Sequence, residues 1–296
     1  MNTNASPKQP KRARWALLSL AAAGSLAATA ALAQQRPGAD NRDGLLTEEQ
    51  VNRIRQVELQ PADLGNPPRI RFEERAVQRF VESRPEINFR AFNAEPDVTK
   101  ALYMVDAAAD PEVLSDVVIA TDPGSLAAFK QNVHTAVLQG CATSACHGSP
   151  DPSKHGGFRL YNEGRDDATV YTNFYTIVRT GVDVPNPTGG AFGGPESVRR
   201  LLVDRQNADA SLLLSYGLPA NASPTPHPQV DGFRPMWNNP NEPTFQFIRG
   251  WIGQGLEKGA GRYGFANEPA ELPNEQAQQG VQVEQTPQGT GQSNPQ

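Results

Sequence analysis

The sequence predicts a mainly α-helical fold with long irregular loops, and three observations support this. Apolar residues recur at three- and four-residue spacing in several stretches, which is the period of one helix face. Thr, Asp or Asn, the usual capping residues, precede several of these stretches. The chain of 296 residues also contains 26 prolines and 26 glycines, which predict extensive irregular structure between the helices.

The first 33 residues have the pattern of a cleavable export signal. Four basic residues near the start are followed by an apolar run over 15–30 and by the small-x-small sequence Ala-Leu-Ala over 31–33. The apolar run is short for a membrane span, and no later stretch is long and apolar enough to cross a bilayer. We therefore expect cleavage after Ala33, export to the periplasm or elsewhere outside the cytoplasm, and no stable membrane insertion of the remaining chain.

Three regions follow the signal. Residues 34–120 are expected to form a small helical N-terminal extension, and residues 121–264 a second helical domain. Residues 265–296 contain no Lys or Arg and are rich in Gln, Pro, Gly and Glu, so this tail is expected to be disordered.

The chain is acidic. Its formal net charge is −5, and removal of a signal with four positive charges and no negative charge leaves −9. An acidic surface repels nucleic acid and anionic membranes, so we expect neither as a partner.

The extension begins with a predicted capped helix. Thr47 is a good N-cap for a helix over 48–58, which carries Val51, Ile54 and Val57 on one side. Further along, the sequence predicts a short strand over 69–72, a helix over 73–82 and two helical pieces within 95–119, divided near Pro111.

The second domain begins with the helix that leads to the cysteines. Asp122 followed by Pro123 is a typical start, with aspartate as N-cap and proline at the first helical position. Gly140 is expected to end this helix. His134 on the same helix is expected to be exposed or cap-like. The predicted buried face consists of Leu126, Phe129, Val133 and Val137.

Further helices are predicted in the rest of this domain, at 166–180, 196–204, 211–214 and 242–258. Asn207 or Asp209 is the expected cap of the third of these. The terminal helix carries Trp251 beside an apolar stripe made of Phe245, Ile248, Ile252 and Leu256.

Both cysteines of the chain lie in one short stretch, Cys141-Ala-Thr-Ser-Ala-Cys146-His147-Gly148. Two thiols followed by an imidazole are what covalent haem attachment requires. Each sulfur adds across one vinyl group of the porphyrin, and His147 then reaches the iron as its proximal ligand. The usual motif has two residues between the cysteines, whereas here there are four.

Two other interpretations of the same stretch remain open. Two cysteines in an exported protein commonly form a disulfide, in which case His147 is an incidental neighbour. A protein-bound metal site is also conceivable, but two thiols and one imidazole leave its fourth ligand unnamed.

The second domain carries a series of short motifs in order: an apolar helix, Cys-x4-Cys-His-Gly, Ser211-Leu212-Leu213-Leu214, His227-Pro228 and Trp251-Ile252. This series resembles the periplasmic cytochrome c-like domains of planctomycete-type bacteria, over about two thirds of the chain after the signal. The resemblance implies a cytochrome c-like helical domain over 121–264 with one covalent haem c. It also implies that the terminal helix packs against the helix before the cysteines, with an aromatic residue at the crossing.

His227 and Met236 are the main candidates for the distal axial ligand. Both lie in a proline-restricted loop before the terminal helix. His227 matches the position at which the resembled family carries a ligand-bearing segment, whereas Met236 lies closer to the terminal helix, as the thioether does in small electron-carrier cytochromes. His155, His134 or an open site are the other possibilities.

The sequence thus predicts an exported monohaem c-type cytochrome that transfers electrons to or from a redox partner protein, and an electron carrier rather than an enzyme. Two alternatives stay open: a haem enzyme or sensor with an open distal site, and a non-haem, disulfide-bridged scaffold or interaction protein.

Overall fold

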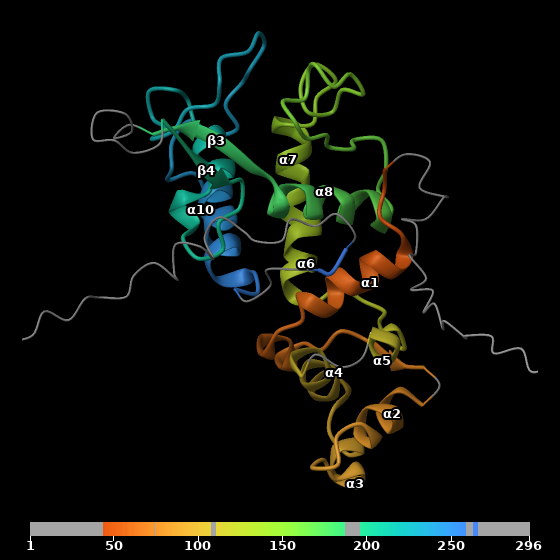
Figure 1. The fold of residues 1–296 in the computed structure, drawn as a ribbon. Coiled ribbons are helices and arrows are strands. Elements are labelled where there is room, and N and C mark those ends of the chain that lie inside the picture. Colours follow the sequence, from red (N-terminus) through yellow and green to blue (C-terminus); the bar gives the residue numbers. More distant parts are fainter. Residues whose placement is uncertain (1–43, 74, 108–110, 187–195, 259–262, 266–296) are drawn as a thin grey trace, which may run out of the picture. The chain divides into compact units, whose positions relative to one another are not determined.

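Helices dominate the part of the chain that the computed structural model describes, namely residues 44–73, 75–107, 111–186, 196–258 and 263–265 (Figure 1). The mainly α-helical prediction is therefore confirmed. The predicted signal, and the predicted tail apart from Phe265, lie outside the described residues. In the described segments, no helix combines the length and the apolar character that a membrane crossing needs.

Helix α1, Glu48–Val57, forms as predicted because its first turn is capped on both sides. The Thr47 hydroxyl accepts the backbone N–H of Gln50 at 3.2 Å, and the Gln50 side chain accepts the N–H of Thr47 at 2.9 Å. This reciprocal pair is a capping box. Val51 and Ile54 are buried, so the apolar side of the helix faces a core as expected.

The chain between residues 59 and 119 builds a hydrophobic cluster of its own. Its elements are η1 Pro61–Gly65, β1 Ile70–Phe72, α2 Ala76–Glu82, α3 Phe89–Asn93, α4 Asp97–Asp106, α5 Pro111–Ser115 and β2 Val117–Ile119.

One part of the helical prediction over 95–119 is wrong, because its last three residues form strand β2. They pair antiparallel with β1, with Ile70 opposite Ile119 and Phe72 opposite Val117. Val117 and Ile119 are fully buried, and this β-branched run packs better in a strand than in a helix.

The helix before the cysteines consists of three consecutive segments, α6 Gly124–Ala128, the π-helical turn η2 Phe129–Val133 and α7 His134–Gly140. Figure 1 shows α6 and α7 as one continuous coil. All four residues of the predicted apolar face are buried, namely Leu126, Phe129, Val133 and Val137.

The predicted N-cap of this helix is wrong by one residue, since Pro123 occupies that position. Asp122 instead accepts hydrogen bonds from the Arg55 guanidinium at 2.8 Å and from the Tyr171 hydroxyl at 2.6 Å. The capping role falls to Asp63, whose carboxylate accepts the N–H of Gly124 at 2.7 Å. A carboxylate that is distant in sequence thus replaces the adjacent one.

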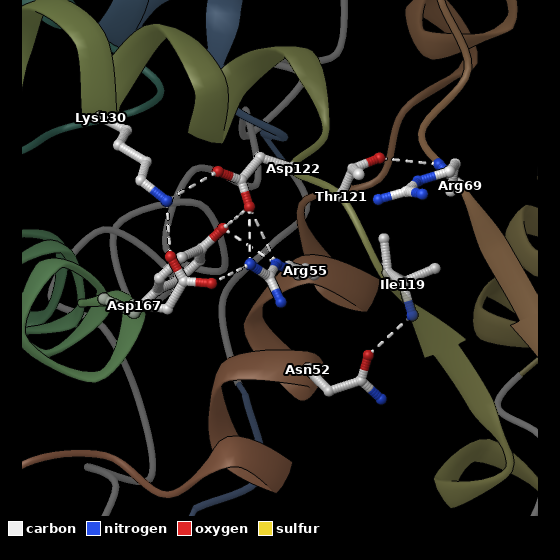
Figure 2. Close-up of polar contacts among 9 residues, drawn as sticks. Asn52, Arg55, Arg69, Ile119, Thr121, Asp122, Lys130 and Asp167 are labelled. Carbon is white, nitrogen blue, oxygen red and sulfur yellow. Dashed lines mark hydrogen bonds and ion pairs between the residues drawn. The ribbon is translucent and has the colours of Figure 1, made fainter.

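Figure 2 shows Asp122 within a charged cluster that joins three helices. Arg55 on α1 also binds Asp167 at 2.6 Å, and Lys130 binds the same carboxylate at 2.5 Å. Burial raises the pKa of Asp167, but the two cations outweigh this effect, so that the pKa lies below its usual value. The carboxylate therefore stays charged, and the cluster ties α1 to the helix before the cysteines.

Helix α8, Asp167–Arg179, confirms the prediction over 166–180, with Asp166 as its N-cap. The predicted helix over 196–204 is wrong. Residues Ser197–Leu201 form strand β4, which pairs antiparallel with β3, Gly181–Pro185. The turn η3, Ala208–Ala210, leads into α9, Leu212–Tyr216, which confirms a short helix here. Its predicted cap is wrong, because Ser211 is the N-cap of α9 and Asn207 caps η3 instead.

The terminal helix consists of α10, Pro243–Gly250, and a π-helical turn η4, Trp251–Gly255, so it ends before the predicted 258. Its predicted apolar stripe is buried. The helix crosses α6, where the indole N–H of Trp251 donates to the carbonyl of Ser125 at 3.0 Å and its ring lies 5.5 Å from that of Phe129. An aromatic residue at this crossing is what the resemblance led us to expect.

A larger core joins the remaining elements and also includes Val51 and Ile54 of α1. Beside it, three polar side chains are buried together. Glu58 is 0% exposed, Arg205 8% and Tyr263 1%. Arg205 and the Tyr263 hydroxyl both donate to the same Glu58 oxygen, at 2.7 and 2.6 Å. This triad connects parts of the chain that are far apart in sequence.

Candidate functional site: a cysteine loop facing a histidine loop

The two cysteines lie in a tightly closed loop at the end of α7. The N–H of Cys141 still donates to the carbonyl of Val137, as in the helix. The N–H of Cys146 then donates to the carbonyl of Thr143 at 3.0 Å, and the N–H of His147 donates to the carbonyl of Cys141 at 3.1 Å. The longer spacing between the cysteines is thus taken up by a turn, and His147 returns to the start of the loop.

Both cysteines are half-buried and unbridged in the structure. Burial raises the pKa of the Cys141 thiol to about 12, and the nearby Cys146 adds to this effect. The thiol is therefore protonated at neutral pH. Its sulfur lies 3.6 Å from the sulfur of Met236.

The ring of His147 is held from one side by the backbone. Its Nδ1 lies 2.8 Å from the carbonyl oxygen of His155 and 3.2 Å from that of Phe158. Carbonyl oxygens only accept, so Nδ1 carries the hydrogen and Nε2 keeps a free lone pair. The ring also stacks on Phe158 at 3.9 Å. Burial lowers the pKa of His147, which favours the neutral, metal-ligating form.

His227 shows the same arrangement on a different loop. Its Nδ1 lies 2.7 Å from the carbonyl oxygen of Pro228, so its Nε2 is also left with a lone pair. Its ring stacks on Phe233 at 4.7 Å, and the edge of Tyr216 contacts it at 5.1 Å. Sequence reasoning did not single out Tyr216 or Phe233. An aromatic residue six positions after His227 is the only sequence signal that pointed to the stack.

The two imidazoles come together although they are 80 residues apart in sequence, and their ring centroids are 6.3 Å apart at an angle of 78°. A metal–imidazole bond is about 2 Å long and a ring nitrogen lies about 1.2 Å from its ring centre, so two imidazoles that share one metal ion have centroids about 6.4 Å apart. The centroid separation of the pair is therefore close to that of two imidazoles bound on opposite sides of one metal ion.

Porphyrin iron needs only these two protein ligands, because the macrocycle supplies the others. A structural zinc site needs four. Among the described residues, no group of three or more His, Cys, Asp or Glu side chains is arranged to hold a metal ion.

Met236 lies beside Cys141 rather than opposite His147. A Cβ at Gly140 would come within 2.2 Å of its Cγ, so the glycine that ends α7 makes room for this side chain. The Met236 N–H donates to the carbonyl of Gly217 at 2.8 Å. In haem c the thioether sulfurs sit at the porphyrin edge, several ångströms from the iron. A sulfur in contact with Cys141 is thus poorly placed for the axial position.

The other two histidines have different surroundings. His134 was expected to be exposed, but it is 2% exposed, and the amide nitrogen of Asn173 lies 2.9 Å from its Nε2. The nitrogen that would bind iron is therefore engaged. His155 contributes its backbone carbonyl to His147.

A cavity of about 530 Å³ opens beside His227. Its wall is mainly apolar and includes Leu218, Pro219, Pro226, Val230, Phe233 and Pro235. The residues that line it do not include Cys141, Cys146 or His147. The cavity therefore lies against the loop that carries His227 and does not reach the cysteine loop.

Comparison of the chain with protein-family models, with curated proteins and with solved structures finds no match.

Proposed function

We propose that this protein is an exported monohaem c-type cytochrome that transfers electrons, with a cytochrome c-like helical domain over 121–264. The observation that carries the proposal is the pair of imidazoles at 6.3 Å, each with Nδ1 directed at a backbone carbonyl, next to a loop with two free thiols. The crossing of the terminal helix with α6 at Trp251 supports the same architecture.

Each residue has a defined part in this proposal. Cys141 and Cys146 fix the macrocycle through thioether bonds, each formed when an S–H adds across a vinyl C=C bond. His147 would be the proximal ligand of the iron, and the carbonyls of His155 and Phe158 keep its ring in the required tautomer. His227 would be the distal ligand, held by its stack on Phe233.

When bound, the haem supplies a one-electron couple. His147 and His227 would together leave no coordination site on the metal for a substrate, and this favours electron transfer over catalysis. Two imidazoles give a lower reduction potential than one imidazole with a thioether. The redox partner is a protein that exchanges electrons with this couple in the periplasm.

The decisive experiment is expression with a cytochrome maturation system, followed by haem staining of a denaturing gel and by mass spectrometry. We expect a stained band and a mass that exceeds the polypeptide by one haem. A colourless band whose mass is that of the polypeptide less two hydrogens would mean that the cysteines form a disulfide, which is the scaffold alternative.

Two variants then test the distal ligand. We expect His227→Ala to convert the low-spin absorption spectrum to a high-spin one, whereas Met236→Leu, a change of similar volume on the same loop, leaves it low-spin. A high-spin spectrum of the unmodified protein would instead indicate the open distal site of a haem enzyme or sensor.

A further inference from the structure

The loop that carries His227 has little regular structure of its own, so something else must hold it in place. It runs from Gly217, at the end of α9, to the buried Trp237. Its two ends are joined, because the N–H groups of Met236 and Trp237 donate to the carbonyl of Gly217 at 2.8 and 3.1 Å. The hydrogen bond of His227 itself goes to the next residue, Pro228. That bond orients the ring but cannot fix the position of the loop, because both partners move together.

The loop is tied to the rest of the molecule two residues before His227. Nη1 of Arg200 donates to the hydroxyl of Thr225 at 2.6 Å, and Nη2 of the same guanidinium donates to the carbonyl of Ala210 at 2.6 Å. Ser223 adds a second tie, since its hydroxyl donates to the carbonyl of Ser215 at 2.7 Å and accepts the N–H of Thr225 at 3.2 Å.

Arg200 is itself on a fixed element. It lies in β4 opposite Val182 of β3 and is half-buried. Its planar guanidinium reaches two acceptors on different segments at once, which a lysine ammonium at the same place does less well. Hydrogen bonds from a charged donor are about twice as strong as neutral ones.

We propose that Arg200, acting through Thr225, is a positioning residue that latches the His227 loop and thereby sets how readily His227 leaves the iron. This inference rests on the proposed function, because it assumes that His227 is the distal ligand. The latch does not touch the iron, so its effect is on the rate and extent of ligand release and not on the identity of the ligand.

The test is carbon monoxide binding to the reduced haem protein, because CO can bind only after His227 has left. We expect Thr225→Val, which keeps the shape but removes the acceptor, to speed CO binding by about tenfold or more, the equivalent of one lost charged hydrogen bond. Thr225→Ser keeps the hydroxyl and should restore the slow rate. Arg200→Lys should fall between the two.

The matched control is Arg199→Gln on the same strand. Arg199 is exposed and pairs with Asp183 at 3.5 Å, so its substitution changes the neighbouring position of β4 and leaves the bond between Arg200 and Thr225 in place. Its CO rate should equal that of the unmodified protein. The melting temperature of the Thr225→Val protein should stay within a few degrees of that of the unmodified protein. This separates the effect of the latch from a general loss of stability.

Equal CO rates for Thr225→Val and Thr225→Ser would overturn the latch while leaving the proposed function intact. An accelerated rate in Arg199→Gln as large as that in Thr225→Val would also overturn it, because a substitution that leaves the bond between Arg200 and Thr225 intact would then have the same effect. An unmodified chain without covalent haem would overturn the proposed function and the latch with it.

Discussion

Gly148 is a steric requirement of the loop that carries both cysteines. A Cβ at this position would lie 2.1 Å from the carbonyl oxygen of Ala142 and 2.9 Å from that of Thr143. Both contacts are with backbone, so the loop itself would have to open. The close return of the chain that brings His147 back to Cys141 therefore depends on a glycine here.

We expect Gly148→Ala to destabilise the protein by about 1–3 kcal/mol, as overpacking typically does, and to reduce haem attachment because the cysteines move apart. Urea unfolding and the intensity of haem staining check the two parts. The control is Gly250→Ala, where a Cβ meets nothing within 4 Å. In a helix this change should be neutral or stabilising by about 0.5–1 kcal/mol. A Gly148→Ala protein as stable as the control would contradict the requirement.

His134 is a buried histidine held in its neutral form. Burial lowers its pKa from 6.5 to about 4, and the charges of Arg165 and Lys130 add to this. In the unfolded chain the ordinary pKa returns, so between about pH 6.5 and 4 the unfolded state binds the extra proton. Stability should therefore fall as the pH falls through this window, by at most about 3 kcal/mol, with no further loss from this group below it.

Urea unfolding of the unmodified protein and of His134→Gln between about pH 7 and 4 checks this prediction. The glutamine can still accept a hydrogen bond from Asn173 but does not titrate. We expect a shallower loss of stability in the variant, because only the titratable groups common to both proteins then respond. Identical pH profiles would show that His134 does not contribute.

The residues of the proposed haem site and its surroundings differ in how readily the sequence reveals them. Cys141, Cys146 and His147 are adjacent in sequence, so their chemistry can be predicted directly. The carbonyls of His155 and Phe158 that hold His147 depend on how the following loop folds, and no side-chain pattern encodes them. His134 was misjudged because its burial depends on Asn173, on another helix.

At the scale of elements, the start of α6 depends on a cap supplied from η1. The Asp63 carboxylate is 6% exposed and accepts two backbone N–H groups, from Gly124 at 2.7 Å and from Gln60 at 2.8 Å. We expect Asp63→Ala to cost about 1–3 kcal/mol, because both donors lose their acceptor in a buried place. Urea unfolding measures this.

The control for Asp63→Ala is Glu49→Ala, an exposed acidic residue in the first turn of α1. It should change stability by no more than about 0.5 kcal/mol. Equal effects of the two substitutions would mean that Asp63 acts only through its charge and not as a cap.

Helices proved predictable where a local cap and an apolar stripe coincide, as in α1 and α8. The strand expected over 69–72 is confirmed by β1, Ile70–Phe72, but the other strands were not predicted. Whether 117–119 and 197–201 become strands is decided by their partners, β1 and β3, and not by local spacing. The predicted cap at Asp122 failed for a similar reason, because Arg55 and Tyr171 compete for its carboxylate.

At the scale of the whole molecule, the triad of Glu58, Arg205 and Tyr263 is the buried charged connection between distant parts of the chain. We expect Glu58→Gln to cost about 3–5 kcal/mol, because it leaves the guanidinium buried without its counter-charge. Tyr263→Phe removes the hydrogen bond that the hydroxyl donates to Glu58 and the one that it accepts from Arg205, but leaves the ion pair, and should cost about 1–3 kcal/mol. Urea unfolding distinguishes the two values.

An exposed ion pair provides the comparison for the triad. Arg249 binds Asp209 through two hydrogen bonds of 2.6 and 2.8 Å, but both side chains are open to solvent. Asp209→Asn should leave the urea midpoint unchanged, since solvent screens such pairs. A Glu58→Gln protein that unfolds at the same midpoint as Asp209→Asn would refute a stabilising role for the triad.

The division of the chain at residue 120 remains a prediction, but the packing shows where the extension meets the rest. Residues between 59 and 119 have their own hydrophobic cluster, whereas Val51 and Ile54 of α1 belong to the larger core. The sequence could not reveal that α1 packs into the larger core. In the chain, α1 is closer to the elements between residues 59 and 119, whose hydrophobic cluster it does not join.

The π-helical turn Phe129–Val133 has a consequence for how the length of this helix can vary. A turn closed by i→i+5 bonds holds one more residue than an α-turn between the same flanks. Deleting a residue there would restore an ordinary turn while Leu126 and Cys141 keep their directions. The same deletion elsewhere in the helix would swing Cys141 by about 100° around the axis. Among natural or engineered chains of this type, one-residue gaps in this helix should therefore gather at that single turn.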